Sequence, residues 1–402
     1  MSKALDDVIA LDLTTQFWSA VGTALLGDFG ARVIRVENLP AARDRSHGDG
    51  GGHEPPVGWD DKAELAQRNK LSVALNLGDD RGARILRELI GKADVFVTDW
   101  PRARLERQRL HYPSLRVLKP DLIYAQASGF GPKGRDRDLP ALDELAAART
   151  GMLPILPQPG QPPVYAGVGQ MYTAVMLAFG VAVALHHRQA TGEGQEVAVS
   201  LFAGNIYGAS LDVQAFLAMG GDRFCHPVPR LDAGNPMSGV LYRSQDGGWV
   251  CLTMPDTDHW WPGLAAIVGL DRDDPRFSSH DKRCGDNRLA LIRILEERFG
   301  QQPAAHWKRV LTEHQLSADV IEEFEYPAND PQAFRNRYIL RLDRPGLGPI
   351  KSLGFPIFMS ETPARLNRSA PCLGQHSAEV LHELLGYPED RIGEFAADGV
   401  IA

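Results

Sequence analysis

The stretch from Val8 to Val36, VIALDLTTQFWSAVGTALLGDFGARVIRV, decides the fold. It opens with the apolar run Val8–Leu13, continues with helix-like spacing as far as Leu26, and closes with a second apolar run, Val33–Val36. Short apolar runs on either side of a helical segment are typical of a strand, helix, strand unit. We therefore expect an α/β protein.

The same alternation continues beyond this unit. Strand-like runs lie at Leu71–Leu75, Asp94–Val97 and Leu122–Ala125, and Arg81–Lys92 has the apolar spacing of an amphipathic helix. Strands that alternate with helices at this spacing favour a mainly parallel, doubly wound sheet. Between Gly151 and Gly169 the chain is rich in proline and glycine, which predicts a long ordered loop.

A smaller domain begins after Met219, where the composition changes. Val240–Thr253 has a hairpin pattern that turns at Asp246-Gly247-Gly248. Three helical segments follow, at His259–Val268, Asn287–Phe299 and Pro303–His314. We expect three stretches: residues 1–220 as the first part of a large domain, 221–330 as a smaller α+β domain, and 331–402 as a return segment that completes the large domain.

Length and charge restrict the number of domains and the ligands that we expect. A chain of 402 residues exceeds what one hydrophobic core usually supports. The formal net charge of -8 is spread along the sequence, with basic residues interleaved among acids, so nucleic-acid binding is not expected.

Cysteine usage and the N-terminus indicate a reducing, cytoplasmic location. The four cysteines (Cys225, Cys251, Cys284, Cys372) lie far apart without a CxxC pair, so neither a disulfide framework nor a metal site is expected. The first residues, MSKALDD, are too charged for a signal peptide. The apolar stretch Met171–Leu185 is shorter than the roughly twenty residues that a bilayer requires, so we expect a buried helix and no membrane association.

Common catalytic motifs are absent. The sequence has no GxSxG, HExxH or GxxxxGK[ST], and its glycine cluster at Gly48–Gly52 is not a GxGxxG that follows a strand. What remains is the turn Ser128–Gly134 (SGFGPKG), placed directly after a predicted strand, and the pair Asp143-Glu144 at the start of an apolar helix. Ligands of parallel sheets bind beyond the carboxyl ends of strands, so the turn could line a site. A solvated turn and acids that merely favour a helix start explain the pattern equally well.

Taken together, the order and spacing of many segments resemble the class III coenzyme A (CoA) transferases, the family that also holds the α-methylacyl-CoA racemases. These segments are LDDVIALDLTTQFWSAVGTALLGDFGARVIRVE (Leu5–Glu37), NKLSVALNL (Asn69–Leu77), ADVFVTDW (Ala93–Trp100), LIYAQASGFGPKG (Leu122–Gly134), ATGEGQEVAVSL (Ala190–Leu201), NPMSGVLYRSQDGGWVCL (Asn235–Leu252), NDPQ (Asn329–Gln332) and APCLGQHSAEVLHELLGY (Ala370–Tyr387).

The resemblance implies a Rossmann-like large domain built from both chain ends, a small central domain and an obligate dimer of interlocked chains. Polar, proline-containing stretches at Leu231–Ser238 and Asp330–Leu353 suit the extended connections that such an assembly needs. It also implies transfer of CoA from an acyl-CoA to a carboxylic acid through an aspartyl anhydride and an aspartyl-CoA thioester. CoA is then a co-substrate, and no tightly bound cofactor is expected.

The family's nucleophilic aspartate follows a glycine, some twenty residues before the TGxGQ motif. Here Gly169-Gln170 holds that place, counted back from Thr191–Gln195. A carboxylate can attack a thioester, whereas a carboxamide is a much poorer nucleophile. We therefore expect Gln170 to be inactive and a paralogous, aspartate-bearing subunit to supply the nucleophile.

The resemblance also suggests residues that contact CoA and a second acid. Asp143 takes the place of the family's second active-site acid, with Glu144 beside it. The candidates for CoA contacts are Gln16, Phe17, Lys70, Leu75, Trp100 (adenine stacking), Arg107 (phosphate), Gly129 and Gly131. Trp100 could equally be a core aromatic residue, and Lys70 and Arg107 could equally be surface charges. Three positions depart from the family pattern, namely Asn38, Leu71 and Asp99.

Three functions are consistent with these residues. The first is the non-nucleophilic subunit of a heteromeric transferase similar to succinyl-CoA:benzylsuccinate CoA-transferase, acting on an aromatic or dicarboxylic acid. The second is a homodimeric isomerase or racemase with Asp143 or Glu144 as base, although Leu142 and Gln170 occupy the places of the racemases' histidine and aspartate. The third is a protein that binds CoA esters, or a partner, without catalysis.

Overall fold

The computed structural model describes residues 3–39, 60–220, 226–344 and 348–402. Gly48–Gly52 and Cys225 lie outside these ranges. The chain divides into two compact units. The large unit comprises residues 1–153, 165–219 and 332–402, and the small unit comprises residues 154–164 and 220–331. The loop segment Pro154–Val164 therefore groups with the small unit, which the sequence did not suggest.

In the described part of the large unit, six strands form a parallel sheet in the order β3-β2-β1-β4-β5-β6. Their bounds are β1 Ile9–Leu13, β2 Arg32–Asn38, β3 Lys70–Leu75, β4 Val95–Thr98, β5 Ile123–Ser128 and β6 Gln195–Ser200. The order reverses between β1 and β4, so the carboxyl ends of these central strands form a topological switch point. The first five strands confirm the predicted ones, whereas β6 was not predicted.

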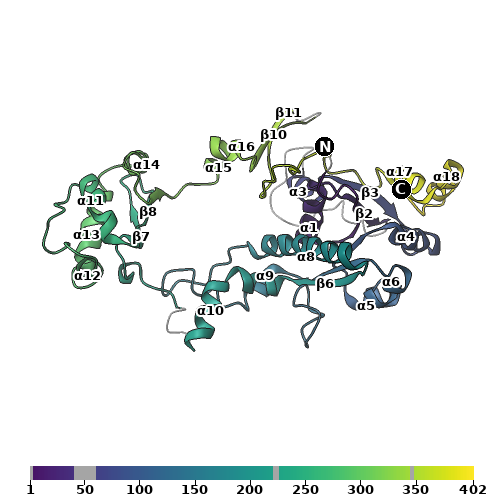
Figure 1. The fold of residues 1–402 in the computed structure, drawn as a ribbon, viewed down its shortest axis with the longest axis horizontal. Coiled ribbons are helices and arrows are strands. Elements are labelled where there is room, and N and C mark those ends of the chain that lie inside the picture. The colour runs from purple at the N-terminus through teal and green to yellow at the C-terminus, as the bar shows by residue number, and fades with distance from the viewer. Residues whose placement is uncertain (1–2, 40–59, 221–225, 345–347) are drawn as a thin grey trace. The chain divides into compact units, whose positions relative to one another are not determined.

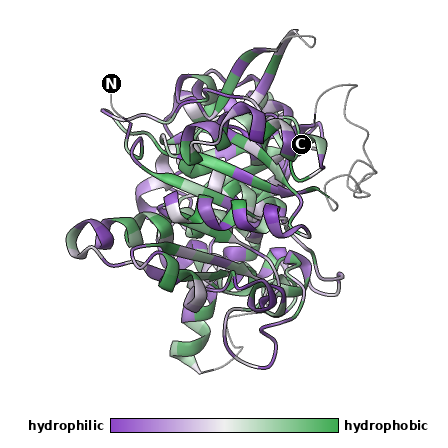
Figure 2. Ribbon diagram, turned by 90° about the vertical axis from the view of Figure 1, so that its right-hand side faces the viewer, coloured by the Kyte–Doolittle hydropathy of each residue, from purple (hydrophilic) through white to green (hydrophobic). Residues whose placement is uncertain are grey.

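Helices cover both faces of this sheet. The helices of the large unit are α1 Phe17–Asp28, α3 Asp61–Gln67, α4 Asp80–Lys92, α5 Arg102–Gln108, α6 Tyr112–Leu118, α7 Asp143–Ala147, α8 Gly169–Thr191, α9 Leu201–Gly208, α10 Ser210–Met219, α16 Pro331–Arg335, α17 Ser377–Leu385 and α18 Glu389–Ala397, although α10 and α16 do not pack on the sheet. One core lies among the sheet, α4 and the C-terminal helices, and a second lies between the sheet and α8. Figure 2 shows green, apolar strands at the centre and helices that carry polar, purple turns.

The two ends of the chain meet in the large unit. In Figure 1 the yellow helices α17 and α18 lie beside β3 and α4. Ile401 forms a bridge with Leu75, and the amide of Asn76 donates to the carbonyl of Val400. The C-terminal segment thus completes the core that the N-terminal half begins.

Helix α8 is long and apolar enough to cross a membrane by length and composition alone. Its buried residues, however, include Leu177 and Val181, which pack in the core beneath β4 and β5. The structure therefore bears out the predicted buried helix, which extends beyond the predicted Met171–Leu185.

The small unit has its own core of apolar residues from a sheet and three helices, α11, α13 and α14. Its elements are η2 Arg230–Asp232, β7 Ser238–Arg243, β8 Trp249–Thr253, α11 Thr257–Val268, α12 His280–Cys284, α13 Arg288–Phe299, α14 Ala304–Glu313, β9 Ala318–Val320 and α15 Glu325–Asn329. The hairpin and the three predicted helices are confirmed.

One connection differs from the prediction. Asp330–Leu353 was expected to be extended, but it contains an antiparallel pair, β10 (Ile339–Arg344) with β11 (Gly348–Leu353). Arg68 fixes its end, since the guanidinium donates to the carbonyls of Leu353 and Gly354 while it pairs with Asp28 at 2.7 Å.

Candidate functional site

A cavity of about 430 Å³ lies at the carboxyl edge of the sheet, and we call it the edge cavity. Residues that follow three neighbouring strands line it: Thr15 and Gln16 after β1, Asp99 and Trp100 after β4, and Gly129 and Gly131 after β5. Of the residues proposed from sequence, the structure thus brings Gln16, Trp100, Gly129 and Gly131 to one cavity. This is where a parallel sheet presents a ligand site.

The Asp99 carboxylate holds the start of α1 at the wall of this cavity. It accepts hydrogen bonds from the amides of Thr15 (2.7 Å) and Gln16 (2.6 Å) and from the hydroxyls of Thr15 (3.0 Å) and Ser19 (2.6 Å). All these donors are neutral. Burial raises the pKa of the Asp99 carboxyl, and the hydrogen bonds from Ser19, Gln16 and Thr15 offset only part of that rise.

Trp100 contributes a buried aromatic wall. Its side chain is 3 % exposed, and its ring is covered by the Arg104 guanidinium, whose central carbon lies 3.3 Å from the ring centroid. The indole Nε1 is buried and has no hydrogen-bond partner in the described residues. Such an orphan donor is costly, so an acceptor from a ligand would stabilise this wall. Because Arg104 covers the ring, adenine could stack there only after Arg104 moves.

Two arginines at the rim are already paired with acids. Arg102 lies 2.9 Å from Glu106, and Arg137 lies 3.3 Å from Asp138. Both pairs are about half exposed, so they contribute little free energy and can open toward solvent. A ligand phosphate would therefore compete with these acids for either guanidinium.

The turn after β5 lines the edge cavity and packs against the residues before α7. A side chain on Gly129 would place its Cβ 2.7 Å from the carbonyl oxygen of Pro140, and Gly131 has a φ of +93°. The carbonyl of Gly129 also accepts from the amide of Phe202 in α9. The turn can therefore pack against the residues before α7 only with glycine here.

The buried Asp143, the half-buried Asn205 and the partly exposed Tyr165 form a hydrogen-bonded group, which we call the Asp143 network. The Asp143 carboxylate accepts from the Tyr165 hydroxyl at 2.6 Å and from the Asn205 amide at 2.7 Å. Burial and the adjacent Asp143 raise the pKa of Tyr165, so the phenol stays protonated and donates. The network joins the start of α7, the segment before α8, and α9.

Gln170 stands in the first turn of α8, directly beside this network. A Cβ at the preceding Gly169 would lie 2.2 Å from the Asn205 amide nitrogen, so only glycine allows α9 to approach this closely. Gln170 itself is half-buried. The N-terminus of a 23-residue helix favours a negative charge, yet this chain places a neutral carboxamide there.

Comparison with known proteins shows the family of this chain. The sequence profile of CoA-transferase family III matches residues 5–377. The chain belongs to CoA-transferase family III. A crystal structure of a CAIB/BAIF family protein from Brucella suis superposes with a TM-score of 0.80 at 25% identity, covering 96% of this chain and all of that one.

Several relatives carry names that describe CoA transfer. Succinyl-CoA:mesaconate CoA-transferase of Haloarcula marismortui is 31% identical, covering 94% of this chain and 96% of its own length. Cinnamoyl-CoA:phenyllactate CoA-transferase of Clostridium sporogenes is 29% identical over 92% of this chain and 90% of its own length. Family III enzymes use CoA thioesters as co-substrates, and the comparisons support general class III CoA transfer for this chain.

Other candidate residues for this family III chain lie away from the edge cavity. Lys70 is fully buried and lies 2.7 Å from Asp12, so its ammonium is not available to a phosphate in this structure. Leu75 belongs to the core, and Phe17 packs beside Val21 and Ala66. Arg107 is exposed on α5, outside the cavity lining.

The two adjacent acids of α7 have different environments. Asp143 is buried in its network, whereas Glu144 is exposed. Only Asp143 therefore has the fixed geometry expected of a site residue.

Sequence reasoning missed several residues of this site. Arg104, Tyr165 and Asn205 were not predicted, and Asp99 was noted only as a departure from the family pattern. A helix-spacing signal existed for Arg104, because it stands four residues after Trp100 and one turn before Arg107. No local signal could have found Tyr165 or Asn205, since both reach Asp143 through tertiary contacts.

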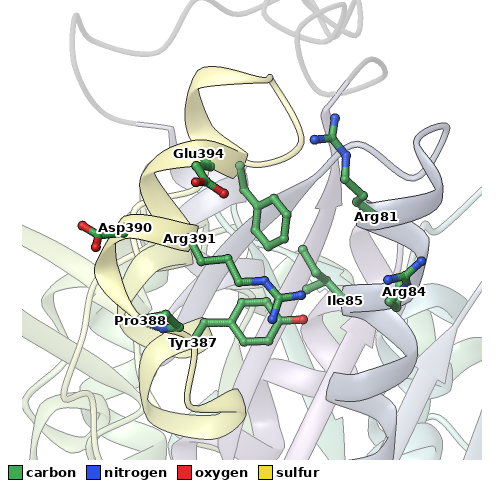
Figure 3. A pocket seen from close by; sticks show the side chains of 9 residues that line it. Arg81, Arg84, Ile85, Tyr387, Pro388, Asp390, Arg391 and Glu394 are labelled. Carbon is green, nitrogen blue, oxygen red and sulfur yellow. The ribbon is translucent and has the colours of Figure 1, made fainter.

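A second cavity of about 360 Å³ lies between α4 and α18 (Figure 3). Two of its three arginines are engaged: Arg81 pairs with Asp79 and Asp398, and Arg391 stacks over the rings of Tyr387 and Phe395. The Arg81–Asp398 pair links α4 to the C-terminal segment. Among the described residues, no group of three or more His, Cys, Asp or Glu side chains could hold a metal ion.

Proposed function

We propose that this chain is the aspartate-lacking subunit of a heteromeric class III CoA-transferase. It acts with a paralogous subunit that carries the nucleophilic aspartate, and the pair moves CoA from succinyl-CoA to an aromatic or dicarboxylic acid. The observation that carries the proposal is the neutral Gln170 at the start of α8, beside a polar network that remains fully hydrogen-bonded.

The chemistry of the first step argues that Gln170 cannot replace the aspartate. A carboxylate attacks the thioester carbonyl, a mixed anhydride forms, and the CoA thiolate leaves. A carboxamide has no acidic proton near neutral pH and no anionic oxygen, so it gives no comparable nucleophile. Without a partner, the chain is not expected to transfer CoA.

The surroundings of Gln170 favour a retained role over general decay. Asp143 keeps both hydrogen bonds, Gly169 keeps the close approach of Asn205, and the turn at Gly129 keeps its contact with Pro140. A decayed site would not retain three interdependent contacts that tolerate so little change in size. These contacts support a site that is still used inside an assembly.

Exposed apolar side chains support the presence of a partner subunit. Helix α10 has no buried residue, and Leu211 and Leu217 on it are largely exposed, as are Phe179 and Val183 on α8. Several exposed apolar side chains on one helix are typical of an interaction site. In the proposed interlocked dimer, the paralogous chain covers this surface.

The names of the relatives guide the choice of substrates. Succinyl-CoA appears in the names of relatives that act on mesaconate and, in Homo sapiens, on glutarate, which are dicarboxylic acids. The Clostridium sporogenes relative acts on phenyllactate, an aromatic acid. These names support succinyl-CoA as donor and an aromatic or dicarboxylic acid as acceptor.

The substitution Gln170→Asp tests whether only the nucleophile is missing. The purified chain alone is incubated with succinyl-CoA and examined by intact-mass measurement and hydroxylamine trapping. We expect no adduct on the wild-type chain and a hydroxylamine-sensitive adduct on Gln170→Asp, because the helix N-terminus stabilises the introduced carboxylate. Gln170→Asn is the matched control, since it has the size of aspartate without the charge.

Co-purification tests the heteromeric assembly. Co-expression with the homologous aspartate-bearing subunit should give a mixed oligomer by native mass measurement, with transfer activity that neither chain shows alone. A CoA adduct on wild-type Gln170, Asp143 or Glu144 would refute the proposal. A homodimer indifferent to the paralogue would favour the isomerase or racemase alternative.

The isomerase alternative has less support from the site. Both oxygens of Asp143 are engaged by Tyr165 and Asn205, and Glu144 is exposed to solvent. Neither acid is therefore positioned as a free general base for proton transfer. The non-catalytic alternative predicts that Gln170→Asp, too, remains without adduct.

A further inference from the structure

We propose that Asp99 sets the charge selectivity of the edge cavity, so that a ligand phosphate is excluded from the start of α1 and a neutral group is accepted there. Only the identity of the ligand, a CoA thioester, rests on the proposed function. The exclusion of anions rests on the position of Asp99 itself.

The first step is that the Asp99 carboxylate already occupies the N-terminus of α1. Backbone amides at a helix N-terminus are a common binding site for phosphate. Here the amides of Thr15 and Gln16 and the hydroxyl of Ser19 already donate to Asp99. The chain thus supplies its own anion, and a phosphate could gain these donors only by displacing a carboxylate that is covalently part of the wall.

The second step is the negative charge of the Asp99 carboxylate. Asp99 has no cationic partner among the groups that hold it, since all its hydrogen bonds come from neutral donors. Two charges about 6 Å apart in a partly screened site interact by about 1.4 kcal/mol, which corresponds to about tenfold in affinity. The basic residues of the lining, Arg102 and Arg137, are paired with Glu106 and Asp138, and Arg104 lies over the ring of Trp100; none of the three donates to Asp99.

The third step is an unpartnered donor in the aromatic wall of the cavity. The Nε1 of Trp100, the residue next to Asp99, is buried without an acceptor among the described residues. A neutral carbonyl satisfies such a donor without bringing a negative charge close to Asp99. The amide carbonyls of the pantetheine arm of CoA have this chemistry, whereas its phosphates do not. The phosphates then lie nearer the rim, toward Arg102 and Arg137.

The test measures binding of two probes by calorimetry: inorganic pyrophosphate, which carries only the charge, and pantetheine, which carries only the neutral arm. We expect Asp99→Asn to raise the pyrophosphate affinity about tenfold and to change the pantetheine affinity less than about twofold. Asp99→Ser should do the same, because it also removes the charge and retains a small hydrogen-bonding group.

Asp94→Asn is the matched control. Asp94 precedes β4 as Asp99 follows it, accepts the amide of Ile9 at 2.8 Å, and pairs with Arg188 at 2.9 Å. It lies roughly 17 Å along the strand from Asp99, beyond the Debye length of about 8 Å at physiological salt. Its substitution removes one charge from the same strand and should leave both affinities unchanged.

The outcomes separate the two proposals. An unchanged pyrophosphate affinity in both Asp99 variants, or an equal gain in Asp94→Asn, overturns the charge selectivity. Loss of the folded state in both Asp99 variants would give Asp99 a purely structural role and overturns it as well. A gain for pyrophosphate with no binding of pantetheine to any variant supports the selectivity of Asp99 and counts against a CoA thioester as the ligand.

Discussion

Two carboxylates on neighbouring strands of the sheet, the buried Asp12 in β1 and the half-buried Asp99 after β4, are held in opposite ways. Asp12 lies 2.7 Å from the Lys70 ammonium and accepts from the hydroxyls of Thr14 and Thr23. Asp99 has hydrogen bonds of similar length but no cation. The charge of Asp12 is therefore balanced by Lys70 inside the core, whereas every hydrogen bond that Asp99 accepts at the wall of the edge cavity comes from a neutral donor.

The pKa shifts of the two carboxyls follow this difference. Burial alone would raise the pKa of Asp12, but Lys70, Thr14 and Thr23 together hold it below its ordinary value. Burial raises the pKa of Asp99, and neutral donors do not reverse the shift. A buried acid therefore acts as a structural brace when it has a cation, and it can influence a ligand when it has none.

The largest expected effect comes from breaking the Asp12–Lys70 pair. Lys70→Met leaves an uncompensated buried charge and should lower the free energy of unfolding by about 3–5 kcal/mol. Urea unfolding at fixed protein concentration measures this loss. The double variant Asp12→Asn/Lys70→Met removes both charges and should recover most of it. If Lys70→Met costs less than about 1 kcal/mol while CoA affinity falls, Lys70 serves the ligand and the brace interpretation fails.

Removing the charge of Asp99 should cost much less stability. Asp99→Asn keeps an oxygen that can accept from Thr15 or Gln16 and relieves the burial of a charge, so we expect a loss of about 1–2 kcal/mol. The same urea measurement checks this value. Asp138→Asn, a largely exposed acid of the same lining, is the control and should change stability by less than about 0.5 kcal/mol. A loss for Asp99→Asn as large as for Lys70→Met would erase the distinction between the two carboxylates.

The comparison of Asp12 with Asp99 also shows which features of the fold the sequence could predict. Hydrophobic periodicity predicted β1 to β5, α4 and the buried helix α8, because burial of one face leaves a regular pattern of apolar residues. The pattern could not show that Lys70, at the first residue of β3, is buried beneath α1 and paired with Asp12. The resemblance suggested a CoA contact for Lys70, and only the packing shows its ion pair.

Helix register limited the prediction at α5. Arg104 and Arg107 are one turn apart, and the point where the chain enters the helix after Trp100 and Pro101 decides which guanidinium covers the indole. Likewise, Tyr165 and Asn205 reach Asp143 from segments 22 and 62 residues away, a distance over which sequence periodicity carries no information.

The smallest expected effect is an opposite dependence of stability on pH for the two carboxyls. Because the folded-state pKa of Asp12 is lowered, its contribution is present above the unfolded pKa of about 3.9 and is lost as the pH falls through the folded value. Because the folded-state pKa of Asp99 is raised, the folded chain takes up this proton before the unfolded chain does, so acidification toward about pH 4 adds stability at this position.

Unfolding free energies of wild type, Asp99→Asn and Asp12→Asn/Lys70→Met between about pH 7 and pH 3 separate the two contributions. Relative to Asp99→Asn, the wild type should gain stability as the pH falls; relative to the double variant, it should lose stability at the acid end. Equal signs for both differences would mean that Asp99 has a cationic partner in solution, and its charge would then no longer act on a ligand in the edge cavity.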